Sequence, residues 1–433
     1  MNYIKTINSY ILSPIMFSVL LLCFVCILII TGGKPLTTPR KILLAFIGDN
    51  KKERASSFRA MTLALAGTLG VGNIVGVATA IHSGGAGSVF WMVMSAFCAM
   101  LIKYAEIVLA LKFRIKENES YHGGAAYYIK YGMNKPLLAG FFSFLCIIAS
   151  LTIGNMIQIN AVTQAAKSEL NIPPFFTGVV IFVLVFYVIY KDAKRISDFT
   201  MGVVPVLSLL FIVFSCAVVI ANIDLVPEIL KKIVTDAFRT DSAVSGILGF
   251  LFMRSLRFGV VRGIGSNEAG CGTAPTAHAT AKTDSPEKQG CWGIFEVFVD
   301  TVLICSLSAF VILIYPENIS KYNGMELVAR SFERFYGKAA GYILTASIFF
   351  FAFSTIISWS YYAMESIYFF TKKEIYRKIY IYLYCVIGVL GAVMTLDAVW
   401  ELSDMTISLM TIINCICIIA LSKKHLNFTK NCV

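Results

Sequence analysis

Long apolar stretches alternate with short polar segments along the whole chain. Stretches without a charged residue cover positions 6–33, 136–166, 170–190, 199–223 and 339–364. At about 1.5 Å per helical residue, each of them is long enough to cross a hydrocarbon core of about 30 Å. Their apolar residues are continuous and do not alternate with a period of two, which excludes a membrane β-barrel. The pattern therefore predicts a polytopic, all-α membrane protein.

A window of about nineteen residues predicts eleven transmembrane helices. They cover 10–31, 60–82, 88–111, 136–165, 173–190, 199–222, 243–262, 290–315, 339–364, 378–396 and 400–421. An odd number of crossings places the two termini on opposite sides of the membrane. With the N-terminus outside, the inner segments hold 25 Lys and Arg residues and the outer segments hold 9. The positive-inside rule therefore favours an outer N-terminus and a cytoplasmic C-terminus.

The composition and charge agree with a membrane protein. Apolar and aromatic residues make up 58% of the 433 positions and charged residues 14%, against about 25% charged residues in a typical globular protein. The net charge of +12 comes from basic residues in short loops, so it indicates a lipid bilayer rather than a nucleic acid as partner. The twelve cysteines lie mostly in apolar stretches and do not indicate an oxidising compartment. The sequence indicates no obligatory protein partner.

Two of the predicted spans are rich in glycine. The second carries Gly-Thr-Leu-Gly-Val-Gly-Asn at 67–73, and each glycine costs a helix about 1 kcal/mol relative to alanine, so a break is expected there. The seventh combines several glycines with Arg254, Arg257 and Arg262. Without the opening helix, these two spans begin the two halves of a five-plus-five arrangement, which is typical of secondary transporters with inverted repeats. The alternative is close helix packing at Gly72-x-x-x-Gly76 without a break.

These spans predict four segments of the chain. An extra N-terminal helix and its cytoplasmic connector take up 1–58, the first inverted repeat 59–223, the second inverted repeat 242–422, and a cytoplasmic tail 423–433.

Several short motifs resemble the alanine or glycine:cation symporter family, in order along the chain. They cover 70–81, 90–91, 103–106, 123–129, 154–158, 259–263, 266–272, 277–284, 300–301, 353–355 and 359–362. The resemblance implies sodium-coupled uptake of alanine or glycine across the inner membrane, on a leucine-transporter-type fold with one added N-terminal helix. Departures from the family pattern concern Val71, Ala125, Arg254, Gly265 and Glu296; those at Val71 and Arg254 bear on substrate preference more than on fold.

Candidate substrate ligands gather at the predicted breaks. Backbone N–H groups at the start of a half-helix suit a carboxylate, and Gly70 and Gly72 would let the ligand approach that backbone. Asn73 carries an amide oxygen that could face a cation and an NH2 group that could face a carboxylate, and Gln158 offers an amide oxygen for an ammonium group. For both residues the alternative is a polar contact between helices. By the resemblance, the second discontinuity is expected within 252–259. The predicted substrate-binding residues are Thr68, Gly70, Gly72, Asn73, Gln158, Phe252, Met253, Ser255 and Trp359.

A sodium site is expected beside the first break. Sodium is a hard cation that prefers several oxygen ligands. The hydroxyl groups of Ser354 and Thr355, with backbone carbonyls freed around Gly67 and Leu69, would supply them. The alternative is that both hydroxyls bond to the preceding turn of their own helix. Sodium is thus the predicted coupling ion.

Charged residues within the predicted spans carry a weaker signal. Lys103 and Glu106 are one turn apart and are expected to pair with each other. Glu296 and Asp300 share a helix face, which could form a proton site, but an ion-pair network with Arg254, Arg257 and Arg262 is the favoured interpretation.

The function that these observations favour is sodium-coupled symport of small neutral amino acids. No metalloprotease, nucleophile-elbow, Walker A or dinucleotide-binding motif occurs in the sequence, so an enzyme is not expected. Three alternatives remain: a proton-coupled carrier, a carrier of broader neutral specificity, and an uncoupled channel.

Overall fold

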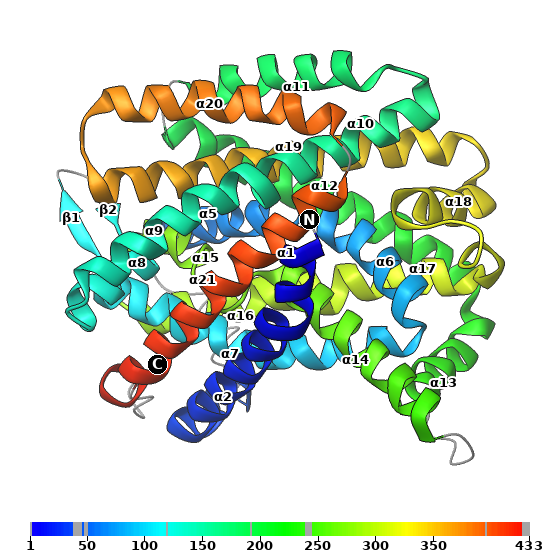
Figure 1. Ribbon diagram of the computed structural model, residues 1–433, viewed down its shortest axis with the longest axis horizontal. Coiled ribbons are helices and arrows are strands. Elements are labelled where there is room, and N and C mark those ends of the chain that lie inside the picture. The colour runs from blue at the N-terminus through cyan, green and yellow to red at the C-terminus, as the bar shows by residue number, and fades with distance from the viewer. Residues whose placement is uncertain are drawn as a thin grey trace.

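The computed structural model describes residues 2–37, 46, 51–117, 120–190, 193–238, 245–394 and 396–426. These residues form an almost entirely helical bundle (Figure 1). The one sheet among them pairs β1 (Ile115–Glu117) with β2 (Ser120–His122) in antiparallel register, with Ile115 opposite His122. The all-α prediction is confirmed.

The helices and helical turns follow one another along the whole chain. In the first half they are α1 (Asn2–Ile7), η1 (Asn8–Leu12), α2 (Ser13–Thr31), α3 (Lys34–Thr37), α5 (Lys51–Thr68), η2 (Val71–Asn73), α6 (Val75–Gly84), α7 (Gly87–Lys112), α8 (Ala125–Tyr127), η3 (Tyr128–Gly132), α9 (Pro136–Leu151), η4 (Thr152–Met156), α10 (Ile157–Leu170), α11 (Pro174–Ile189), α12 (Ala193–Ala221), η5 (Ile223–Leu225) and α13 (Val226–Ala237). In the second half they are α14 (Ser245–Asn267), α15 (Ala274–His278), α16 (Pro286–Val297), η6 (Phe298–Cys305), α17 (Ser306–Ile314), η7 (Pro316–Asn318), α18 (Gly324–Tyr336), α19 (Ala339–Phe370), α20 (Glu374–Val393) and α21 (Leu396–His425).

Many of these helices can cross a membrane. Eight in the described part of the chain are long and apolar enough, or nine if the bent pair of α5 and α6 counts as one span. The eleven predicted spans also include α11, which is a shorter apolar helix, and α14, which is not among these eight helices. The polytopic character is confirmed, while the count of eleven and the division into two inverted repeats stay predictions.

The first predicted break is confirmed. Helix α5 ends at Thr68 and α6 begins at Val75, and the two directions differ by 64°. Gly70, between them, has extended backbone angles of φ −116° and ψ −156°. The glycine-rich sequence thus interrupts the helix where helix propensity is lowest.

The predicted position of the second break is wrong. Helix α14 runs without interruption through 252–259 and ends at Asn267. Gly259 and Gly263 instead serve close packing, because a Cβ on either would clash with α7, at the Ser88 carbonyl oxygen and the Ser95 hydroxyl respectively. The break follows instead at 268–273, where Glu268, Gly270 and Gly272 have positive φ angles of 53°, 85° and 77°. A left-handed backbone at three positions is incompatible with a continuing helix.

The N-terminal helix α2 lies beside α21, the last helix of the chain, and also contacts α7 (Figure 1). It therefore packs against the outside of the bundle. This position agrees with a helix added to a core that begins at α5.

Cysteine labelling tests the predicted orientation. With the N-terminus outside, Lys51 at the start of α5 faces the cytoplasm and Lys338, between α18 and α19, faces outward; both are exposed. A membrane-impermeant maleimide should label Lys338→Cys but not Lys51→Cys in intact cells, and both after permeabilisation. Labelling of Lys51→Cys alone in intact cells would reverse the orientation.

Candidate substrate and ion site

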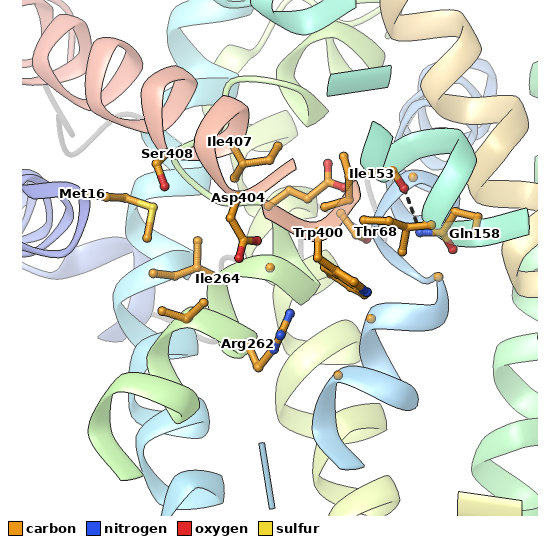
Figure 2. Close-up of a pocket in the computed structure, with 18 residues that line it drawn as sticks. Met16, Thr68, Ile153, Gln158, Arg262, Ile264, Trp400, Asp404, Ile407 and Ser408 are labelled. Atoms are coloured by element: carbon orange, nitrogen blue, oxygen red, sulfur yellow. Dashed lines mark hydrogen bonds between the residues drawn. The ribbon is translucent and has the colours of Figure 1, made fainter. Parts of the chain in front are cut away.

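A cavity lies where the break between α5 and α6 faces the end of α14, and residues of α2, α10 and α21 complete its wall (Figure 2). Its wall includes five of the predicted residues: Gly67, Thr68, Gly70, Gly72 and Gln158. Its other polar lining residues are Arg262, Glu268, Asp404 and Ser408. The cavity therefore contacts both breaks.

The cavity shares part of its wall with a wider groove. Gly76, Ile157, Arg262, Trp400 and Asp404 line both spaces, and the groove continues along the start of α18. The Arg262 guanidinium lies 4.9 Å from the centre of the Trp400 ring, and Figure 2 shows the Asp404 carboxylate directed toward it. These side chains separate the cavity from the groove.

Gln158 supports the first break. Its Oε1 accepts a hydrogen bond of 3.1 Å from the Val71 N–H, and its Nε2 donates to the Ile153 carbonyl at 3.1 Å. The side chain therefore satisfies a backbone group that the break leaves without a helical partner. The contact of Gln158 with a substrate ammonium group stays a prediction. One lone pair of its Oε1 already accepts the hydrogen bond from Val71.

Gly70 is the position that requires a glycine at this break. A Cβ there would lie 2.8 Å from Thr355 Oγ1 and 2.9 Å from Gln158 Oε1, whereas a Cβ on Gly72 would meet nothing closer than 3.7 Å. Neither residue has a positive φ. The constraint on Gly70 is therefore the close approach of these side chains and not a left-handed backbone.

Thr355 contacts the carbonyls freed by the break. Its Oγ1 lies 2.9 Å from the Ala66 oxygen and 3.3 Å from the Leu69 oxygen. Both hydroxyls also lie within hydrogen-bond distance of the Phe351 carbonyl of their own helix, Ser354 at 2.8 Å and Thr355 at 3.1 Å. The alternative of a bond within the helix thus describes Ser354, whereas Thr355 combines that bond with contacts to the freed carbonyls. The oxygen set next to the break therefore combines Thr355 with Leu69 and Ala66. Gly67 instead packs against the Tyr362 ring.

Asn73 lies against Asp300 and not in the cavity wall. Its Nδ2 donates to Asp300 Oδ1 at 2.7 Å, and its buried Oδ1 has no hydrogen-bond partner in the described part of the chain. Thr301 donates to Asp300 Oδ2 at 2.8 Å, and its hydroxyl lies 2.9 Å from that of Ser266. This cluster joins η2, the end of α14 and η6.

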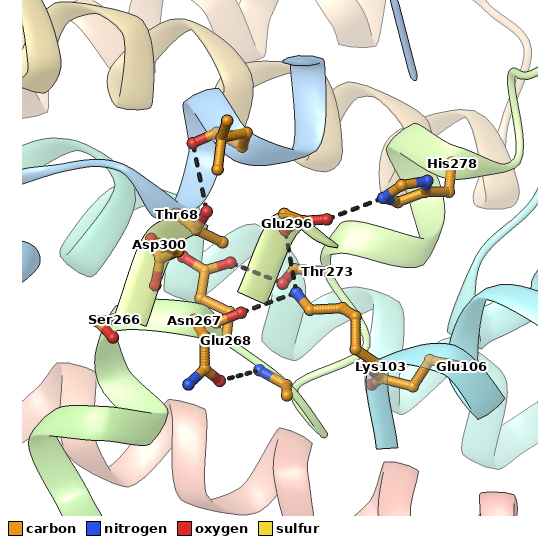
Figure 3. A network of polar contacts seen from close by, with 12 residues as sticks. Thr68, Lys103, Glu106, Ser266, Asn267, Glu268, Thr273, His278, Glu296 and Asp300 are labelled. Carbon is orange, nitrogen blue, oxygen red and sulfur yellow. Dashed lines mark hydrogen bonds and ion pairs between the residues drawn. The ribbon is translucent and has the colours of Figure 1, made fainter. Parts of the chain in front are cut away.

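Lys103 forms a buried ion pair with a residue from a distant part of the sequence (Figure 3). Its Nζ lies 3.2 Å from Glu296 Oε1 and donates to the Asn267 carbonyl at 2.7 Å. Glu296 Oε2 lies 2.8 Å from His278 Nε2. The predicted Lys103–Glu106 pair and the predicted network of Glu296 with Arg254, Arg257 and Arg262 are therefore wrong. The packing of the helices determines which charged residues pair, and the spacing of residues along one helix does not reveal that packing.

Glu106 holds the other side of the second break. It accepts hydrogen bonds from the Gly272 N–H at 2.9 Å and from Asn414 Nδ2 at 2.5 Å. Lys103 binds the last carbonyl of α14, where a cation is favourable, and Glu106 binds an N–H beyond the break. One turn of α7 thus stabilises both ends of the interruption.

Glu268 is a cavity residue that was missed from the sequence. It is 4% exposed, and its carboxylate accepts from Trp359 Nε1 at 3.0 Å and from Thr273 Oγ1 at 2.7 Å. No basic side chain of the described residues lies within ion-pair distance of it. Its place in the motif at 266–272, next to Gly270 and Gly272, could have indicated the break and this carboxylate.

The remaining predicted residues lie away from the cavity. Trp359 binds Glu268 and covers Gly154 but does not line the space. Ser255 donates to the Gly84 carbonyl at the far end of α6, at 2.5 Å. The side chains of Phe252 and Met253 lie outside the described residues; their backbone is at least about 20 Å along α14 from its end at Asn267.

An interrupted helix, α5 with α6, that faces the left-handed turn after α14 across a cavity in a bundle of apolar helices is typical of a secondary transporter. Residues 1–432 match the sodium:alanine symporter family, and the chain belongs to this family. It is a transporter and not an enzyme, as the sequence predicts.

Similar proteins include the sodium/alanine symporter AgcS of Methanococcus maripaludis, which is 33% identical over 99% of this chain and 96% of its own length. The putative sodium/proton-dependent alanine carrier protein YrbD of Bacillus subtilis is 33% identical over 89% of this chain and 82% of its own length. Among solved structures, a Na⁺-coupled sialic acid symporter superposes with a TM-score of 0.55 at 17% identity, covering 89% of this chain and 82% of that one. The similarity to the sialic acid symporter concerns the fold alone.

Proposed function

We propose that the protein takes up alanine and glycine across the inner membrane by sodium-coupled symport with alternating access. The observation that carries the proposal is the cavity at the first break, whose wall includes Gly70 and Gly72 and whose neighbour Thr355 contacts freed carbonyls. Backbone near a helix interruption suits a substrate carboxylate, and carbonyl and hydroxyl oxygens suit sodium. The family and the name of its relative AgcS support the same ion and substrate.

Uptake by purified protein in liposomes tests this proposal. An imposed inward sodium gradient should drive labelled alanine and glycine to concentrations above those outside, and a proton gradient alone should not. Liposomes without protein supply the background. Accumulation driven by protons alone would favour the proton-coupled alternative, for which the name of YrbD gives a precedent. Saturable entry that never exceeds equilibration would indicate an uncoupled pathway.

The sodium dependence should rest on Thr355 more than on Ser354. Thr355→Val keeps the shape of the side chain but removes the oxygen next to the Ala66 and Leu69 carbonyls. We expect the sodium concentration for half-maximal uptake to rise by about tenfold. Ser354→Ala is the matched control, because its hydroxyl bonds within its own helix, and it should change that concentration far less. Equal sodium dependence in both variants would remove Thr355 from the ion site.

Substrate size should be limited by the cavity wall. A single methylene discriminates by only about 1–3 kcal/mol, so alanine and glycine should differ modestly, whereas the branched side chain of leucine should clash. Unlabelled leucine is therefore expected to compete poorly against labelled alanine. Equal competition by leucine and alanine would indicate a carrier of broader neutral specificity.

A further inference from the structure

The polar centre of the bundle holds more negative than positive groups. Within the described residues, four fully buried carboxylates lie around the two breaks, together with one lysine and one histidine; they are Glu106, Glu268, Glu296, Asp300, Lys103 and His278. Lys103 and His278 both contact Glu296 (Figure 3). Burial of an uncompensated charge is costly. The remaining carboxylates therefore favour cationic ligands.

Among these carboxylates, Glu268 is the one that lines the cavity. Its positive φ of 53° ends α14 and turns the chain away from the helix. Trp359 and Thr273 hold its two oxygens with one hydrogen bond each. A carboxylate oxygen can accept two hydrogen bonds, so each oxygen keeps acceptor capacity for a ligand. The Glu268 carboxylate is thus held in position, and its oxygens can still accept hydrogen bonds from a ligand.

A second carboxylate in the wall, Asp404, lies near Arg262, the one basic residue in the cavity lining, and Figure 2 shows it directed toward that side chain. The positive charge that acts on Glu268 is Lys103, which lies outside the cavity lining and forms its ion pair with Glu296. Gly70 and Gly72 of the first break lie in the same cavity wall as Glu268. A zwitterion therefore finds backbone suited to its carboxylate at one break and an unpaired carboxylate at the other.

We propose that the Glu268 carboxylate binds the α-ammonium group of the substrate, with the substrate carboxylate directed to the first break. The inference rests on the proposed function and adds a selectivity to it. The site distinguishes amino acids from 2-hydroxy acids of the same size, because a hydroxyl group cannot neutralise a buried carboxylate. Trp359 acts as a positioning residue through its hydrogen bond to Glu268.

Binding to the purified protein tests the inference with alanine and with lactate, which carries a hydroxyl where alanine carries an ammonium group. Hydrogen bonds to charged groups contribute about 1.5–3 kcal/mol, or roughly 10- to 150-fold in affinity. The parent protein should therefore prefer alanine strongly. Glu268→Gln keeps the size of the side chain, and it should weaken alanine binding by about that factor while leaving lactate binding unchanged or stronger.

Three comparisons make the outcome decisive. Asp404→Asn should retain the preference for alanine over lactate; loss of the preference there, with retention in Glu268→Gln, would overturn the inference in favour of Asp404. Equal weakening of both ligands in Glu268→Gln, with a raised sodium requirement, would also overturn it, because the carboxylate would then serve the cation. Should Glu268→Gln not fold, Glu268→Asp withdraws the charge by one methylene, and an unchanged alanine-to-lactate ratio in that variant would overturn the inference.

The same experiment separates this inference from the proposed function. If the parent binds neither alanine nor glycine in the presence of sodium, the proposed function fails and the inference fails with it. If the parent binds alanine and Glu268→Gln keeps the full preference over lactate, the inference alone fails. Trp359→Phe should lower the preference by less than Glu268→Gln, since it removes one donor and leaves the charge.

Discussion

Gly70→Ala is expected to lower sodium-dependent alanine uptake strongly while folded protein remains in the membrane. The added methyl group would lie 2.8 Å from Thr355 Oγ1 and 2.9 Å from Gln158 Oε1, so it displaces both side chains from the first break. Overpacking of this kind costs about 1–3 kcal/mol, which corresponds to roughly 5- to 150-fold in transport if the loss falls on the ligand-bound state.

Gly72→Ala is the matched control, two residues further along. A Cβ there has no protein neighbour closer than 3.7 Å and the backbone is not left-handed, so Gly72→Ala should leave the side chains at the first break in place, and any loss of uptake in it reports contact with the substrate. Initial rates in liposomes, normalised to the protein recovered in a monodisperse detergent peak, provide the measurement. Complete loss in Gly72→Ala with normal rates in Gly70→Ala would show that the ligand and not the side-chain contacts sets the need for glycine.

The second large effect concerns stability. Lys103→Met removes the cation that pairs with Glu296 and binds the Asn267 carbonyl, and leaves a buried carboxylate with only His278 beside it. Removing one partner of a buried ion pair costs about 3–5 kcal/mol. The variant should therefore show a clearly lower melting temperature in detergent and a lower membrane abundance.

Two further variants isolate the cause of that loss. Lys103→Met combined with Glu296→Gln removes both charges and should regain part of the stability, because no unpaired charge stays buried. Lys112→Met, at the C-terminal end of α7, breaks a partly exposed pair with Glu287 and an exposed bond to the His425 carbonyl, and it should cost less than about 1 kcal/mol. A double variant that is no more stable than Lys103→Met would assign the loss to the bond with Asn267 instead.

The sequence predicts the membrane architecture and the first break well, because both depend on local properties. A long charge-free stretch indicates a transmembrane span by its composition alone. The glycines at 67–73 lower helix propensity whatever their tertiary contacts are. Gly70 and Gly72 follow from that break, Gln158 follows from its amide group in the fourth predicted span, and the structure brings all three to one cavity.

The second break could not be located in the same way. Glycines in α14 let it approach α7, and only the partner helix distinguishes that role from a helix break. The ion pairs were missed for a similar reason. Lys103 and Glu296 are far apart in sequence, whereas helical spacing suggested a partner one turn away.

Helix α19 contacts both interruptions with residues four positions apart. Thr355 lies against the carbonyls of the first break, and Trp359, one turn further along the same face, holds Glu268 of the second. A shift of this helix relative to either break changes the geometry at both. An ion bound at one end of this turn and a solute bound at the other are therefore energetically linked. In the proposed transport cycle, thermodynamic reciprocity then requires sodium to change the affinity for the amino acid by the same factor by which the amino acid changes the affinity for sodium.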